Sequence, residues 1–75
     1  MNKSQILTEK QKIILEMKAN GLRNKQIMDV LEVSETTIHQ HLREVCRKLN
    51  AKNTSHAIAI AILKGYIHLE MDASD

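Results

Sequence analysis

Five hydrogen-bonding side chains recur at helical spacing in the middle of the chain: Thr36, His39, Gln40, Arg43 and Arg47. At about 100° per residue, four of them fall on one side of a helix, and His39 lies at its edge. An arginine can donate two hydrogen bonds to guanine, a glutamine can pair with adenine, and a histidine can donate to a purine edge. The spacing therefore indicates a surface that contacts DNA bases. The alternative is the polar outside of an ordinary amphipathic helix.

The opposite side of this helix is apolar. Its members follow one another at i, i+4, i+7 and i+11, and they are Ile38, Leu42, Val45 and Leu49. The pattern predicts a helix over 35–49 with this stripe buried.

A shorter helix, predicted over 24–31, precedes the longer one. The two residues Glu32 and Val33 leave room only for a turn, and Ser34 is a suitable N-cap for the longer helix. A short helix joined by a tight turn to a longer helix with a polar stripe can dock in the DNA major groove. The start of the longer helix suits phosphate through Ser34, Thr36 and Thr37. Arg47, beyond Arg43 on the same stripe, is assigned to the DNA backbone as well.

Two further helices complete the predicted fold. Thr8 and Gln11 form a capping-box pair at the start of a first helix, and a last helix begins after Asn53 or Thr54 and ends at Gly65. The fold class is therefore all-α, a four-helix helix-turn-helix domain. We expect a flexible N-terminal arm at 1–6, the domain at 7–67 and an acidic C-terminal tail at 68–75, with both ends loosely held.

The last helix carries two apolar stripes, although a peripheral helix can bury only one against its own core. The first stripe holds Ala57, Ile58, Ala61 and Ile62. The second holds Ala59, Ile60 and Leu63, with Ile67 beyond the helix end. Pairing of two copies would bury the second stripe, and a helix sunk more deeply into its own core is the alternative. A two-fold dimer would place its reading helices about 34 Å apart, which predicts an inverted-repeat DNA site.

Several separated segments also match a known pattern in order and spacing. They are Leu7-Thr8, Gly21-Leu22, Asn24 to Ile27, Val33 to Ile38, His41, Lys48-Leu49 and Ala57. These segments resemble the LuxR/GerE/NarL-type helix-turn-helix domain over about residues 7–67. The sequence departs from that pattern at Gln11, which replaces an acidic residue, and at Arg23, which replaces a Ser or Thr N-cap.

The resemblance implies a role for individual residues. The resemblance implies that His39, Gln40 and Arg43 contact DNA bases, and the helical spacing selects the same three residues. The resemblance places the phosphate backbone near Asn24, Lys25, Ser34 and Thr37. It further implies that the third helix reads the major groove and that the fourth helix dimerises.

Composition and the absence of other motifs limit which further functions the chain could have. Residues 1–65 contain all eleven Lys and Arg but six of the nine acids, so the body of the chain is basic and its end acidic. His39 and His41 lie about 200° apart on a helix and do not converge on a metal. Cys46 fits a small core residue better than a redox switch. No nucleophile with its base, phosphate loop or apolar span of about 20 residues is found, so we expect no enzyme, cofactor, metal, small-molecule ligand or membrane.

The predicted function is that of a cytoplasmic transcription regulator, a homodimer that binds double-stranded DNA sequence-specifically. RNA polymerase or a related regulator would be a further partner. The alternative is a protein-binding antagonist, which pairs through the fourth helix with a larger relative and blocks its DNA binding.

Overall fold

The computed structural model describes residues 6–70 and contains four α-helices within them. They are α1 (Glu9–Ala19), α2 (Asn24–Leu31), α3 (Glu35–Leu49) and α4 (Thr54–Leu63). No strand occurs in this part of the chain, so the all-α prediction is confirmed. The predicted bounds of α2 and α3 are confirmed as well, whereas α4 ends two residues before Gly65, which adopts a positive φ of 77°.

Side chains at the helix starts explain where three of the helices begin. Thr8 and Gln11 form the predicted reciprocal box at α1, each side chain accepting the other's backbone N–H at 3.1 Å. Ser34 Oγ accepts the Thr37 N–H at α3, and Asn53 Oδ1 accepts the His56 N–H at α4.

The start of α2 is capped differently. Arg23 has no side-chain oxygen to offer, and only one half of a reciprocal cap is present there, because Gln26 Oε1 accepts the Arg23 N–H at 2.8 Å. The turn that follows α2 passes through Glu32, whose φ of 57° and ψ of 49° lie in the left-handed region. This turn sets the direction in which α3 leaves α2.

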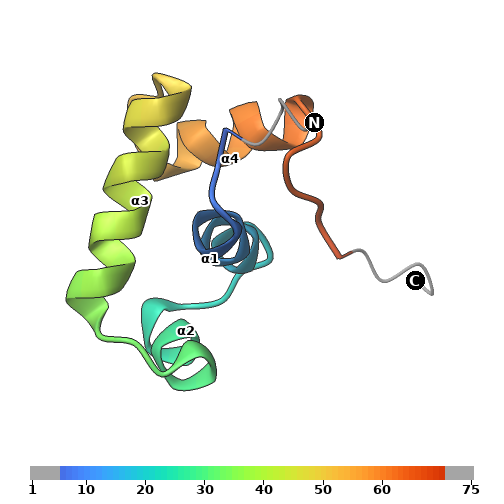
Figure 1. The fold of residues 1–75 in the computed structure, drawn as a ribbon. Helices are drawn as coiled ribbons and strands as arrows, with labels where there is room; N and C mark the ends of the chain where they lie inside the picture. Colours follow the sequence, from blue (N-terminus) through green and yellow to red (C-terminus); the bar gives the residue numbers. More distant parts are fainter. Residues whose placement is uncertain (1–5, 71–75) are drawn as a thin grey trace.

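The four helices enclose one aliphatic core. Figure 1 shows α1 end-on at the centre, with α3 along one side, α4 across its top and α2 below. Helix α3 packs against the other three helices, and α1 also contacts α2 and α4. The largest fully buried side chains are Ile14, Leu15, Ile27, Ile38, Val45 and Ile67.

The segment after α4 returns along α1 and is held there by three hydrogen bonds. The His68 N–H donates to Glu16 Oε2 at 2.7 Å, Asn20 Nδ2 donates to the His68 carbonyl at 3.3 Å, and the Glu70 N–H donates to Asn20 Oδ1 at 2.5 Å. The expectation of a loosely held end from residue 68 is therefore corrected for 68–70. The rest of the predicted tail, and residues 1–5 of the predicted arm, lie outside the described residues.

Candidate nucleic-acid interface

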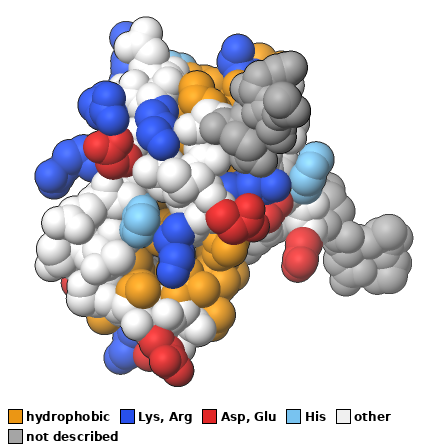
Figure 2. Space-filling view, viewed as in Figure 1, with side chains coloured by type: hydrophobic (Ala, Val, Ile, Leu, Met, Phe, Trp, Pro, Cys, Tyr) orange, Lys and Arg blue, Asp and Glu red, His pale blue; other side chains and the backbone are white. Residues whose placement is uncertain are grey.

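The two sides of α3 differ as its sequence predicts. Ile38, Leu42 and Val45 are buried against the core. The five side chains of the polar stripe on α3 are all exposed, and they are Thr36, His39, Gln40, Arg43 and Arg47. Figure 2 shows Lys and Arg side chains, with an acidic side chain among them, over the upper part of α3 at the left of the view.

One ion pair and one contact between a histidine and a carboxylate lie on this polar side. His39 Nε2 is 3.6 Å from Glu35 Oε2, a distance at which a protonated imidazole would pair with the carboxylate. Arg47 Nη2 donates to Glu44 Oε1 at 2.5 Å. Exposed pairs of this kind contribute about 0–1 kcal/mol, so a phosphate can replace either carboxylate at little cost. Glu44 was not among the residues selected from the sequence.

An open groove of about 660 Å³ runs beside α3 and takes its lining from all four helices. Its apolar floor is formed by Leu42, Cys46 and Ile58. Its polar lining consists of Lys18, Asn24, His39, Arg43, Asn53, Thr54 and Ser55. No carboxylate is among these residues, so the groove offers donors and positive charge to a polyanion such as DNA.

Arg43 connects this groove with a smaller recess further along α3. The recess, of about 430 Å³, is lined by Gln40, Arg43, Glu44 and Arg47. Two of the three predicted base-reading residues, His39 and Arg43, therefore share the groove, and Gln40 and Arg43 share the recess. The three side chains form one continuous surface along α3.

Apart from Arg47 in the last turn of α3, the residues predicted to contact the DNA backbone lie at the starts of α2 and α3. Asn24 is partly buried, and its Oδ1 accepts a hydrogen bond from Lys18 Nζ at 3.0 Å. Lys25 is exposed in the first turn of α2. At α3 the hydroxyl oxygens of Ser34 and Thr37 are 3.0 Å apart, so both belong to the cap.

Sequence reasoning missed the contributions of α1 and α4 to this groove. Lys18 and Ser55 line the groove, and neither was among the residues selected from the sequence. Their positions depend on how α1 and α4 cross α3, and no periodicity within one helix contains that information. The capping role of Asn53 was the only signal that marked the start of α4 in the sequence.

The predicted dimerisation surface is only partly exposed. Leu63 is 84% exposed, Ala59 is exposed and Ile60 is partly buried. Ile67, however, is only 1% exposed, because the chain after α4 turns back and inserts this side chain into the core of its own domain. The assignment of Ile67 to the dimer surface is therefore corrected.

Neither a metal site nor a membrane-spanning helix occurs within residues 6–70. No group of three or more His, Cys, Asp or Glu side chains there could hold a metal ion, and none of the four helices is long and apolar enough to cross a membrane. Cys46 is a free thiol at the edge of the core.

A short helix, a tight turn and a longer helix with an exposed polar side define a helix-turn-helix protein. The sequence pattern of the family described as "Bacterial regulatory proteins, luxR family" matches residues 5–61. The chain belongs to this family, which is made up of DNA-binding transcription regulators.

Individual relatives agree with this membership. The chain is 46% identical over 48 residues to the nitrate/nitrite response regulator protein NarP of Escherichia coli, which covers 64% of the chain. It is 44% identical over 57 residues to the glycerol metabolism activator of Pseudomonas putida, and 39% identical over 64 residues to the transcriptional regulatory protein YdfI of Bacillus subtilis, which cover 76% and 85% of it. These matches span 22%, 26% and 30% of the respective relatives, so the chain corresponds to one part of longer proteins.

Proposed function

We propose that the chain binds double-stranded DNA sequence-specifically, with α3 in the major groove, and thereby regulates transcription. The observation that carries the proposal is the exposed row of His39, Gln40 and Arg43 beside a groove without a carboxylate. The major groove is about 12 Å wide and admits one helix. In this position Arg43 would read guanine, Gln40 adenine and His39 a purine edge, while Asn24 and Lys25 would contact phosphates.

The proposed binding form is a homodimer joined through α4. Leu63, Ile60 and Ala59 would form the contact, since an exposed leucine is stabilised by roughly 1.5–3 kcal/mol when it is fully buried. Two copies related by a two-fold axis would present two α3 helices to half-sites about 34 Å apart. The expected site is therefore an inverted repeat. As a regulator of transcription the protein would act in the cytoplasm, with RNA polymerase or a related regulator as a further partner.

Selection of bound duplexes from a random-sequence library, at about 0.15 M salt, tests this proposal. The expected result is an inverted repeat whose half-sites are separated by about one DNA turn. The variant Arg43→Ala, tested in parallel, should select the same repeat with one base pair relaxed in each half. Recovery of no sequence above background would contradict the proposal.

A second candidate function rests on the exposure of Leu63, which is 84% exposed on α4. Through α4 the chain could pair with a larger LuxR-family protein and keep that protein from DNA. Calorimetric titration of a relative's DNA-binding domain with this chain would distinguish the two functions. Tight pairing together with no binding to any duplex would favour the antagonist.

A further inference from the structure

We propose that Lys18 of α1 contacts the phosphate backbone of bound DNA, so that α1 forms part of the interface. The inference rests on the proposed DNA-binding function and adds a residue that the sequence pattern does not mark. Lys18 lies in the last turn of α1, on the helix that forms the centre of the core rather than on either helix of the helix-turn-helix pair.

The position of the Lys18 side chain is fixed by a neighbour. Its Nζ donates to Asn24 Oδ1 at 3.0 Å, and the side chain is partly buried. An ammonium group has three N–H donors, so two remain after this bond. Asn24 is the first residue of α2 and a proposed backbone contact, which places the ammonium group at the edge of the proposed interface.

The charges around α1 show which surface suits a polyanion. Lys18 lines the groove of about 660 Å³ together with His39 and Arg43, and no carboxylate lines it. A second groove bordering α1, of about 510 Å³, lies against the returning segment at 68–70, and its largely apolar lining includes the carboxylates of Glu16 and Glu70. Phosphate is attracted to the first groove and repelled by the second.

The chemistry of the side chain favours phosphate over bases. A lysine ammonium is a compact point charge on a flexible stem, whereas base recognition depends on paired donors such as those of Arg43. Lys18 also belongs to a different helix from the base-reading row. Its contribution should therefore be largely independent of DNA sequence.

The test measures the affinity of the full chain for a duplex of random sequence at several salt concentrations. Log affinity falls as log salt rises, and removing one phosphate contact should make this negative slope less steep by about 0.9 per protomer. If the contact contributes nothing at 1 M salt, this corresponds to a loss of roughly eightfold per protomer at 0.1 M salt. Lys18→Gln and Lys18→Met should both show this loss, and Lys18→Met preserves most of the apolar stem.

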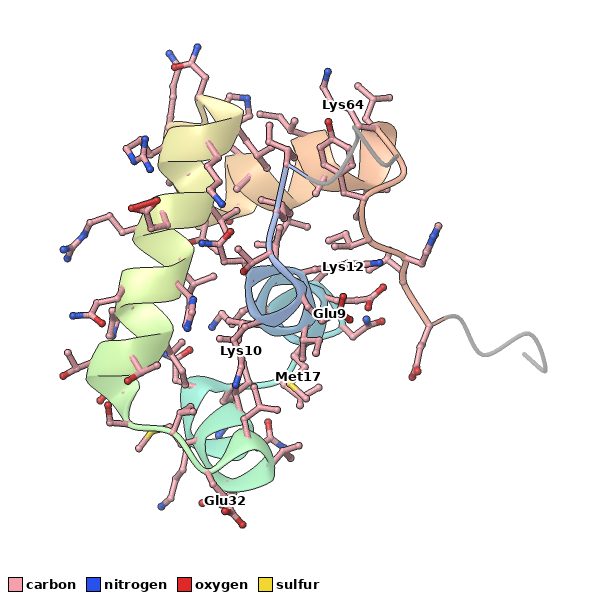
Figure 3. The ribbon with its side chains drawn as sticks, viewed as in Figure 1. Glu9, Lys10, Lys12, Met17, Glu32 and Lys64 are labelled. Carbon is pink, nitrogen blue, oxygen red and sulfur yellow. The ribbon has the colours of Figure 1, made fainter. Side chains whose placement is uncertain are left out.

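Two variants separate charge from positioning. Lys18→Arg retains the charge and should restore the slope. Asn24→Ala removes the acceptor but leaves the ammonium group. The salt dependence of its affinity should therefore be steeper than that of Lys18→Gln. The control is Lys10→Gln, a variant of an exposed lysine at the opposite end of α1 (Figure 3), which should bind like the wild type.

Each outcome decides the proposal. A wild-type slope for both Lys18→Gln and Lys18→Met, with helical content preserved by circular dichroism, would overturn the phosphate contact and leave the proposed function intact. If Lys18→Arg were as weak as Lys18→Gln, the residue would act by orienting Asn24, and the contact would again be rejected. No binding by the wild-type chain itself would remove the proposed function and this inference together.

Discussion

Gln11 Oε1 and Lys48 Nζ are 2.8 Å apart and join the first turn of α1 to the last turn of α3 across 37 positions of sequence. The same oxygen accepts the backbone N–H of Thr8, so one buried amide closes the cap of α1 and holds α3 against it. The LuxR-type pattern has an acidic residue at this position. Here a neutral side chain makes both contacts, so no negative charge is buried at this junction.

Replacement of Gln11 tests the importance of this junction. Gln11→Ala removes both hydrogen bonds and leaves the Lys48 ammonium group without this acceptor, so the free energy of unfolding should fall by about 1–3 kcal/mol. Gln11→Glu keeps both acceptors and adds a charge opposite Lys48, and should be at least as stable as the wild type. Urea denaturation of the two variants measures the difference. Equal midpoints for Gln11→Ala and the wild type would show that the junction is not stabilising.

Arg43 is expected to carry most of the base discrimination. No hydrogen bond or ion pair of its side chain is found within residues 6–70, so Arg43→Ala should leave the fold unchanged. Affinity for the selected site should fall by about 1–3 kcal/mol per half-site, with relaxed preference at one base pair. Competition binding with single-base variants of the site measures both effects. An unchanged preference at every base pair would show that another residue reads the site.

Glu44 should weaken DNA binding, because its carboxylate lies on the proposed DNA-facing surface and pairs with Arg47. Glu44→Gln removes one negative charge and releases Arg47, so affinity for duplexes of any sequence should rise severalfold at low salt. Fluorescence anisotropy at two salt concentrations measures the gain. The control is Glu9→Gln, a change of an exposed carboxylate in the first turn of α1, on the side turned away from α3 (Figure 3), which should leave affinity nearly unchanged. Equal gains in affinity for both variants would show that the effect comes from the net charge of the chain and not from the position of Glu44 on the proposed DNA-facing surface.

Leu63 and Ile67 should respond in opposite ways to substitution. Leu63→Glu changes a side chain that is 84% exposed in the single chain, so it should abolish dimerisation and leave the monomer folded. Ile67→Ala changes a side chain that is 1% exposed and should lower the free energy of unfolding by about 2–5 kcal/mol. Sedimentation equilibrium and thermal melts distinguish the two. A dimeric Leu63→Glu variant would place the subunit contact elsewhere.

Asn20 should control the segment after α4, because its side chain bonds the backbone on both sides of Leu69. Asn20→Ala removes both bonds, and the amide of Glu70 should then exchange with solvent markedly faster. Hydrogen exchange followed by NMR measures this rate. The amide of Ile38, in the core-facing side of α3, serves as the reference and should exchange as in the wild type.

Most of the fold could be predicted from the sequence because its signals are local. The cap at Thr8, the cap at Ser34 and the stripe from Ile38 to Leu49 act within one helix or one turn. The structure agrees with them, except that Leu49 is only partly buried. The polar side of α3 could be predicted for the same reason. A helical period divides a helix into two sides without reference to the rest of the chain.

The errors concern relations between helices. Ile67 continues the apolar pattern of α4, but the helix has ended by then and the chain turns the side chain inward. Lys18 has the spacing of a solvated lysine on α1, yet the crossing of α1 and α2 brings it to Asn24. The backbone of residues 68–70 is hydrogen-bonded to the side chains of Glu16 and Asn20, which lie about fifty positions earlier in the chain. Such relations follow from tertiary packing, and the spacing of residues within one helix carries no information about it.

The groove beside α3 has a thermodynamic consequence, since its lining comes from all four helices. An unfolded chain would not present this surface, so a duplex bound there would bind the native state selectively. At a duplex concentration one hundred times the Kd, such selective binding adds about 2.7 kcal/mol to the free energy of unfolding. That is a large gain for a domain of this size, in which burial alone leaves little margin. Copies bound to such a duplex would therefore resist proteolysis longer than free copies.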